Sequence, residues 1–132
     1  MQRHSSNFER SNVPFAWRYI MNGNELKKWI IENNIKQRTI ESFWRCFENY
    51  KVENPDEYDE YFGLFDKGSL TVWTDKIALK IMNWDTFYEE YNENHEFVEA
   101  YLKLEYKNKY IGYYSLLFNF SGEAFDDYFV LE

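Results

Sequence analysis

The sequence predicts a single α+β domain, in which helices pack on one antiparallel sheet. Apolar stripes at helical spacing come first, within residues 21–52, and alternating β-rich runs separated by short turn signals fill residues 96–132. The chain has 132 residues, enough to bury a core without disulfides, and no linker or internal repeat divides it. We therefore expect one domain over residues 21–132, preceded by a flexible or loosely docked N-terminal arm over residues 1–20.

Two helices are predicted at the start of this domain, and together they form an αα-hairpin. Asn24 is a suitable N-cap for the first helix, and Asn33 and Asn34 are natural stops at its end. Thr39 is a suitable cap for the second helix. This second helix carries an apolar stripe at i, i+3, i+4 and i+7 that needs a partner surface, formed by Ile40, Phe43, Trp44 and Phe47.

The middle of the chain predicts a loop, a hairpin and a third helix. Residues 53–60 place five carboxylates around a proline, and burying them would be costly, so we expect a surface loop. Residues 61–65 and 70–74 flank the turn signal D-K-G-S and are predicted to be paired strands. Residues 77–81 either extend the second of these strands or form another. A third helix is predicted over residues 83–91, which carry apolar residues at helical spacing.

Residues 96–132 contain three β-rich runs, typical of an antiparallel meander. The second run is apolar on both faces and is predicted to be the central strand. The first run, residues 96–106, alternates strictly and predicts one buried face, formed by Val98, Ala100, Leu102, Leu104 and Tyr106.

Strict alternation also assigns the faces of side chains in the second and third runs. It puts Tyr110 on the same face as Tyr114, and Ile111 on the opposite face. In the third run it puts Phe125 on the same face as Phe129.

Charge and cysteine content indicate the kind of partner and the compartment. The formal net charge is −8, with residues 1–52 at +4 (nine Lys and Arg, five Asp and Glu) and residues 53–132 at −12 (six against 18). The acidic part repels nucleic-acid phosphates and anionic membranes, and it speeds association with a basic partner. Cys46 is the single cysteine, and neither an apolar stretch typical of a signal peptide near the N-terminus nor a long apolar segment elsewhere is seen in the sequence. We expect a soluble, cytoplasmic protein that binds neither nucleic acid nor membrane directly.

Clusters that combine carboxylates with tyrosines are the main candidates for a binding site. Tyrosine offers contact area at low entropic cost, and carboxylates pair bidentately with arginine on a basic protein. Aromatic residues make up 22% of the chain, more than a core of this size can bury, so some must reach the surface. The candidate partner-binding residues are Asp56, Glu57, Tyr58, Asp59, Glu60, Tyr61, Glu89, Glu90, Glu93, Asp126, Asp127 and Tyr128. The alternative is that the acids only keep an aromatic-rich domain soluble.

The rival interpretation is a metal-dependent nuclease or hydrolase. Glu105 and Lys107 are predicted near the end of a strand, where alternation points both to the same face, as an E-x-K site requires. Such a site also needs an upstream acid, for which three residues are formally available: Asp66, Asp75 and Asp85. The alternative for Glu105 and Lys107 is a solvated charge ladder on the outer face of the sheet.

Other catalytic and metal chemistry finds little support in the sequence. Cys46 lies on a predicted helix and His95 in a predicted turn, so they form a nucleophile pair only if the fold brings them together. One cysteine and two histidines do not supply a usual zinc site, and the acids of residues 53–60 lack the spacing of a calcium loop. We predict no cofactor, no resident metal ion and no catalytic residue.

The C-terminal sequence is Y-I-G-Y-Y-S-L-L-F-N-F-S-G-E-A-F-D-D-Y-F-V-L-E. Together with the acidic and aromatic stretches before it, it resembles the ends of small bacterial immunity proteins that neutralise polymorphic or contact-delivered toxins. It is also similar to small acidic inhibitors that phages use against host defence nucleases. The resemblance covers about a sixth of the chain. It implies a non-enzymatic, cytoplasmic, stoichiometric inhibitor of a basic effector, such as a nuclease or a nucleic-acid-binding protein.

Overall fold

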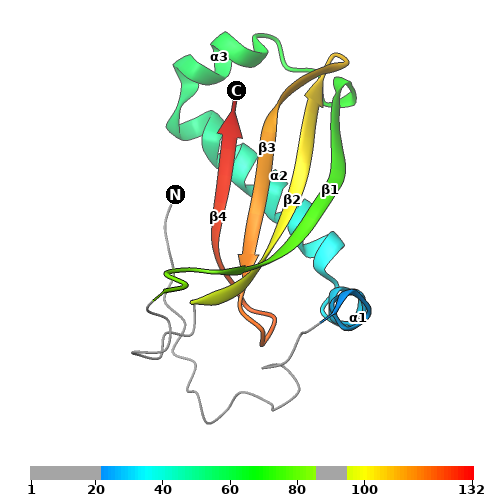
Figure 1. Ribbon diagram of the computed structural model, residues 1–132. Helices are drawn as coiled ribbons and strands as arrows, with labels where there is room; N and C mark the ends of the chain where they lie inside the picture. Colours follow the sequence, from blue (N-terminus) through cyan, green and yellow to red (C-terminus); the bar gives the residue numbers. More distant parts are fainter. Residues whose placement is uncertain (1–21, 86–94) are drawn as a thin grey trace.

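Within the residues that the structure describes, the fold consists of three helices and a four-stranded antiparallel sheet, which confirms the predicted α+β class (Figure 1). The computed structural model describes residues 22–85 and 95–132. The predicted N-terminal arm and most of the helix predicted over residues 83–91 lie outside them. The elements are α1 (Gly23–Glu32), α2 (Ile35–Glu53), α3 (Pro55–Phe62), a 3₁₀ turn (Lys67–Ser69), β1 (Leu70–Ile81), β2 (Glu96–Tyr106), β3 (Lys109–Phe118) and β4 (Ala124–Leu131).

The two N-terminal helices were predicted correctly, but both predicted caps are wrong. Asn22 caps α1, because its side chain accepts a hydrogen bond from the backbone N–H of Glu25 at 2.9 Å. Asn34 adopts a left-handed conformation, with φ at 50°, and turns the chain directly into α2. Thr39 is therefore an interior residue, and its hydroxyl donates to the Ile35 carbonyl at 2.7 Å.

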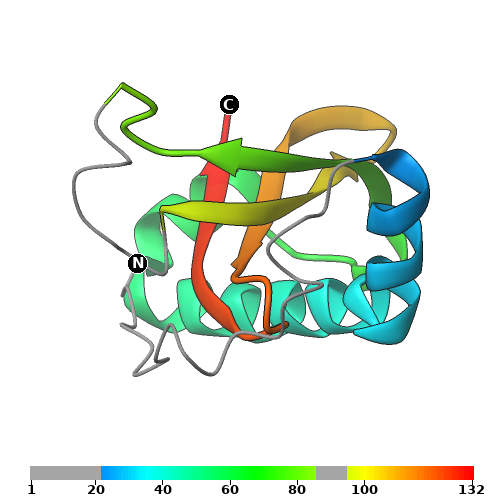
Figure 2. The ribbon, with the colours of Figure 1, turned by 60° about the horizontal axis from the view of Figure 1, so that its bottom comes forward.

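Helix α2 crosses one face of the sheet, which we call the helix-side face. Helix α1 lies at the N-terminal end of α2 and runs at a steep angle to it (Figures 1 and 2). The predicted stripe faces the sheet, with Phe43 and Phe47 fully buried and Trp44 half-buried at its margin. The Phe43 ring lies 5.6 Å from the ring of Tyr114 on β3. Burying one such phenylalanine contributes about 1.5–3 kcal/mol. The α2 stripe and the sheet thus form the main core.

The segment between α2 and the sheet differs from both predictions. Residues 53–60 complete α2 and form most of α3, so the predicted surface loop is wrong. Pro55 occupies the first turn of α3, where its missing N–H costs nothing, and acidic residues follow it there, which suits a helix N-terminus. The strand predicted over residues 61–65 is also wrong, because Phe62 ends α3 and buries its ring in the core.

The sheet is a meander with the order β1-β2-β3-β4, so β2 and β3 are both interior strands. Residues 77–81 extend β1, which was one of the two expectations. The buried face predicted for β2 is confirmed, since all five of its residues belong to the main core. The prediction that β3 is buried on both faces is confirmed by Leu116 and Leu117, which point to opposite faces and are both buried.

A β-bulge in β4 reverses the predicted face of Phe125. Leu117 pairs with Asp126 and Phe118 pairs with Ala124, so Phe125 is an extra residue without a partner. Its ring lies on the outer face, away from the helices, at 5.9 Å from the ring of Phe97. The predicted alignment of Phe125 with Phe129 is therefore wrong.

A second bulge, in β3, reverses Tyr110 and Ile111. Leu104 pairs with Gly112 and Glu105 pairs with Tyr110, which leaves Ile111 as the extra residue. Ile111 packs against the main core, and Tyr110 is exposed. Gly112 is required here, because a Cβ atom at this position would lie 1.9 Å from the Val130 carbonyl oxygen.

Candidate protein-binding surface

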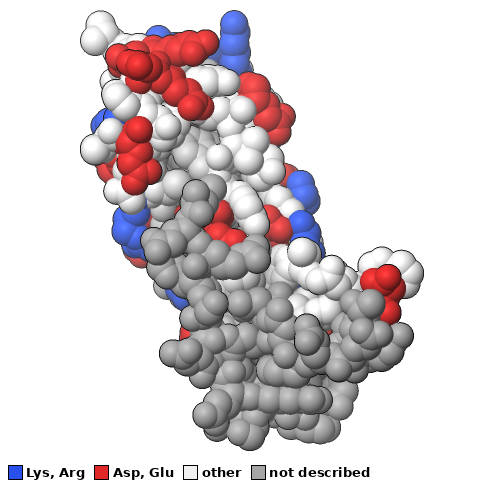
Figure 3. Space-filling model, turned by 90° about the vertical axis from the view of Figure 1, so that its left-hand side faces the viewer, with Lys and Arg blue, Asp and Glu red and all other residues white. Residues whose placement is uncertain are grey.

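Helix α3 carries the first predicted cluster, and it presents the carboxylates of that cluster to solvent. Asn54 is both the C-cap of α2 and the N-cap of α3, so this single residue connects the two helices. The end of α2 and the start of α3 therefore lie next to each other. The exposed side chains there form what we call the α3 surface. It comprises Val52, Glu53, Asp56, Glu57, Asp59, Glu60, Tyr61 and Leu64. Figure 3 shows carboxylates gathered at the end of the molecule where α3 lies.

Aromatic side chains on the opposite side of α3 hold the helix in place. The Phe62 ring lies 5.3 Å from that of Phe47 on α2 and 5.2 Å from that of Tyr106 on β2. Tyr58 is half-buried, with its ring 6.0 Å from that of Phe47. Tyr58 was predicted to bind a partner, but its ring packs inside the protein and anchors α3. The carboxylates are consequently held on a fixed helix rather than on a mobile loop.

Two exposed apolar side chains flank the carboxylates, and sequence reasoning missed both. Val52 lies in the last turn of α2 with 81% of its surface exposed, and Leu64 follows α3 with 97% exposed. Tyr61 is also exposed, as predicted. Only the packing of Phe47 and Phe62 reveals which residues of this segment remain outside. The α3 surface therefore combines negative charge with apolar contact area.

The charge of α3 also acts on the neighbouring core. Tyr50 lies on α2, and its ring is 6.3 Å from that of Tyr58. Burial raises the pKa of Tyr50, and the carboxylate of Glu57 raises it further. The Tyr50 phenol therefore remains a neutral group beneath the acidic helix at physiological pH.

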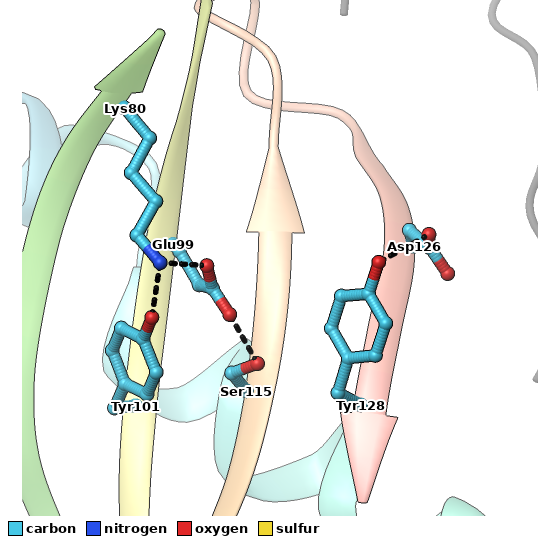
Figure 4. A network of polar contacts seen from close by, with 6 residues as sticks. All are labelled: Lys80, Glu99, Tyr101, Ser115, Asp126 and Tyr128. Carbon is cyan, nitrogen blue, oxygen red and sulfur yellow. Dashed lines mark hydrogen bonds and ion pairs between the residues drawn. The ribbon is translucent and has the colours of Figure 1, made fainter. Parts of the chain in front are cut away.

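The predicted cluster on β4 is divided between the two faces of the sheet. Asp126 is buried on the outer face, where the exposed Tyr128 donates a long hydrogen bond of 3.4 Å to it (Figure 4). Asp127 lies on the helix-side face and accepts a hydrogen bond of 2.8 Å from the Tyr114 hydroxyl. Because that hydroxyl has one proton, the Ser42 hydroxyl donates to it, at 2.6 Å. These three β4 residues thus do not form one surface.

The remaining predicted acids, Glu89, Glu90 and Glu93, lie outside the described residues. The α3 surface is accordingly the one predicted cluster that the described part of the chain presents to solvent as a unit.

The outer face of the sheet contains a partly buried ion pair that the sequence did not reveal. Lys80 Nζ lies 2.7 Å from Glu99 Oε1 and also donates to the Tyr101 hydroxyl, while Ser115 donates to Glu99 Oε2 at 2.6 Å (Figure 4). Burial alone would lower the pKa of Lys80, but its hydrogen bonds to Glu99 and Tyr101, together with the electrostatic attraction of the same two groups, outweigh burial and raise the pKa. The cross-strand pairing of β1, β2 and β3 brings these side chains together.

The geometry of the E-x-K residues differs from the prediction. Strand β2 ends at Tyr106, and Lys107 and Asn108 both adopt left-handed conformations in the tight turn to β3. Lys107 Nζ lies 5.3 Å from the centroid of the Tyr106 ring, on the helix-side face, whereas Glu105 lies on the outer face and pairs with Lys103 at 3.4 Å. The predicted placement of Glu105 and Lys107 on one face is wrong, because the turn ends the alternation.

The candidate acids and metal ligands have other surroundings. Asp66 caps the 3₁₀ turn by accepting from the Gly68 N–H at 3.1 Å, and Asp75 pairs with Lys76 at 3.3 Å. No group of three His, Cys, Asp or Glu side chains that could hold a metal ion occurs among residues 22–85 and 95–132.

Cys46 is poorly suited to act as a nucleophile. It is half-buried on α2. Burial, followed by the carboxylates of Asp127 and Glu53, raises the pKa of Cys46 to about 12. At neutral pH the thiol is therefore protonated, whereas the thiolate is the reactive form.

Comparison with known proteins does not identify a family. The chain matches no protein-family model, no curated protein and no solved structure. Across the described parts of the chain, none of the helices is long and apolar enough to cross a membrane. The surface chemistry above is therefore the basis for a functional proposal.

Proposed function

We propose that this chain is a non-enzymatic, cytoplasmic inhibitor of the immunity type, which binds a basic effector protein through the α3 surface. The effector would be a nuclease or a nucleic-acid-binding protein, and binding would cover the basic surface with which the effector contacts nucleic acid. The observation that carries the proposal is the α3 surface itself, where exposed carboxylates lie beside exposed apolar side chains on a helix fixed by packing.

Charge and rigidity both favour this kind of partner. A nucleic-acid-binding protein presents Arg and Lys where it contacts phosphates, and the carboxylates of α3 complement that surface. Long-range attraction raises the association rate. Val52, Tyr61 and Leu64 add apolar area that becomes buried only on contact. Because Phe47 and Phe62 already hold α3, little conformational entropy is lost on binding.

The same chemistry serves an inhibitor that a phage directs against a defence nuclease of its host. The two roles differ in the identity of the basic partner and in the genes beside this one. A toxin gene directly upstream would indicate immunity, and a phage operon would indicate the anti-defence role.

The experiment measures binding to basic proteins encoded beside this gene, by surface plasmon resonance, for the native chain and two matched variants. The test variant reverses three carboxylates of the α3 surface: Glu57→Lys, Asp59→Lys and Glu60→Lys. The control variant reverses three exposed carboxylates elsewhere: Glu32→Lys, Glu41→Lys and Glu123→Lys. Each set changes the formal net charge from −8 to −2, since three reversals add two charges each.

We expect the test variant to lose most of its association rate and the control variant to keep most of it. Equal losses in both variants would mean that net charge alone attracts the partner. Unchanged binding of the test variant would contradict a role for the α3 surface. Nuclease activity of the purified chain with Mg²⁺, Mn²⁺ or Zn²⁺ that Glu105→Gln abolishes would contradict a non-enzymatic function.

A further inference from the structure

Strand β1 forms one edge of the sheet and contains the third β-bulge (Figure 1). Thr74 pairs with Leu102 and Ile77 pairs with Ala100, so Asp75 and Lys76 together oppose the single residue Tyr101. The bulge shifts the alternation by one residue. As a result, odd-numbered side chains point to the outer face before it and to the helix-side face after it.

This shift makes β1 symmetric about the bulge. Residues of β1 that pair with core residues of β2 lie on the helix-side face. Before the bulge these are Leu70, Val72 and Thr74, and after it they are Ile77 and Leu79. Ile81 continues that series, two residues beyond Leu79. The outer face holds Thr71 and Trp73 before the bulge and Ala78 and Lys80 after it. The order of faces is therefore the same when the strand is read from either end.

The outward edge of β1 carries no further strand within residues 22–85 and 95–132. Among the described residues, β1 pairs only with β2. It is the longest strand of the sheet, and it exposes large apolar side chains: Trp73 at 51%, Leu79 at 43% and Ile81 at 47%. Long, exposed edge strands with apolar side chains tend to pair with another strand.

We propose that β1 pairs antiparallel with β1 of a second copy of this chain, about a two-fold axis that passes between Asp75 and Lys76. In this register Asp75 lies opposite the partner's Lys76, and the symmetry repeats the pair, which gives two ion pairs at the axis. Trp73 lies opposite the partner's Ala78, a large side chain beside a small one. The apolar pairs on the helix-side face are Val72 with the partner's Leu79 and Leu70 with the partner's Ile81.

The bulge selects this register over others. Opposed side chains in an antiparallel pair must lie on the same face. Here they do so along the whole strand, because the two bulges stand directly opposite each other. Any other register sets the bulge of one strand against a regular stretch of its partner, so the faces no longer match on one side of the bulge.

A second copy fits this edge better than a foreign strand. A bulge and charged side chains normally deter pairing with an arbitrary strand. An identical strand places its own bulge directly opposite the bulge of β1. It also places its Lys76 opposite Asp75 and its Asp75 opposite Lys76. In the single chain these two side chains are substantially exposed and contact each other at 3.3 Å, and Lys76 Nζ lies 4.5 Å from the centroid of the Tyr101 ring. Exposed ion pairs of this kind contribute little, so exchanging Asp75 for the partner's Asp75 costs Lys76 little.

The test is the mass of the native chain and of charge variants, measured by sedimentation equilibrium over a range of concentrations. The native chain should dimerise. Lys76→Glu places only carboxylates at the axis, and Asp75→Lys places only ammonium groups there. Each should weaken dimerisation by at least about tenfold, because attraction becomes repulsion twice per dimer. Both positions are exposed, so circular dichroism should show an unchanged fold.

Two further samples separate the proposed pairing from a general charge effect. An equimolar mixture of the Lys76→Glu and Asp75→Lys variants should form heterodimers, because each supplies the charge that the other lacks. The double variant Asp75→Lys/Lys76→Asp should dimerise like the native chain. A native chain that stays monomeric would overturn the proposal and indicate that the bulge prevents β1 from pairing with a second copy. Dimers that persist in both single variants would also overturn it, by assigning the interface to another surface.

Discussion

Phe47 links the core to the proposed binding surface, and replacing it with alanine is the most direct test of that link. Its side chain is fully buried, and its ring centroid lies 5.0–6.4 Å from those of seven aromatic residues: Phe43, Trp44, Tyr50, Tyr58, Phe62, Phe65 and Phe129. Two of these, Tyr58 and Phe62, belong to α3. Removing the ring opens a cavity where α2, α3 and β4 meet.

The expected loss is a large part of the total stability. Phe→Ala substitutions in a packed core reduce the free energy of unfolding by about 3–5 kcal/mol, and domains of this size have roughly 5–15 kcal/mol in all. The measurement is urea-induced unfolding followed by circular dichroism and tryptophan fluorescence. Val52→Ala is the control, because Val52 is exposed on the same helix and its truncation should change stability by less than about 0.5 kcal/mol.

A milder variant keeps the test informative if Phe47→Ala does not fold. Phe47→Leu retains an apolar side chain but loses the ring contacts with Tyr58 and Phe62, so α3 should loosen first. Hydrogen exchange of the α3 amides should accelerate more than that of β2 and β3. A loss below about 1 kcal/mol in Phe47→Ala, or equal acceleration across all elements in Phe47→Leu, would refute the idea that Phe47 holds α3 to the core.

Three further predictions concern charge and ionisation. The Lys variant at Glu57, Asp59 and Glu60 should associate more slowly with a basic partner and show a flatter salt dependence in stopped-flow kinetics, with little change in the dissociation rate. Glu99→Gln should lower the free energy of unfolding by about 1–3 kcal/mol, because Lys80 loses its charged partner in a partly buried ion pair and keeps only the Tyr101 hydroxyl. Glu105→Gln, at a more exposed pair, should lower it by less than about 0.5 kcal/mol. Equal losses in urea unfolding would contradict this distinction. Cys46 should react with iodoacetamide at pH 8 at least about 100-fold more slowly than it does in urea, since its pKa is raised to about 12 and the thiolate is scarce. The thiol of the unfolded chain ionises near its ordinary pKa of 9.0, whereas the thiol of the folded chain stays protonated up to about pH 12. The free energy of unfolding of the native chain should therefore fall, relative to that of Cys46→Ala, as the pH rises from about 9 to about 12. Rapid labelling of the folded chain at pH 8 would mean that the thiol is not shielded.

Local patterns in the sequence determined the fold class and the core. The helical spacing of Phe43 and Phe47 predicted the buried face of α2, and the alternation of Val98 to Tyr106 predicted the buried face of β2. Both patterns repeat over several residues, and burial of apolar area enforces them. The acidic composition of residues 53–60 likewise predicted that they would be exposed, and their carboxylates are.

Only the tertiary structure decided how those patterns are interrupted and which surfaces result. The bulges at Asp75, Ile111 and Phe125 each shift the alternation by one residue, and the bulge in β4 puts Phe125 on the same outer face as its neighbour Asp126. No residue type in the sequence marks a bulge, because it arises from the register that two strands reach when their other side chains pack. The helical form of residues 55–62 was missed for a similar reason. Such a short helix gains most of its stability from tertiary contacts, here the packing of Phe62 against Phe47, which lies 15 residues earlier in the chain.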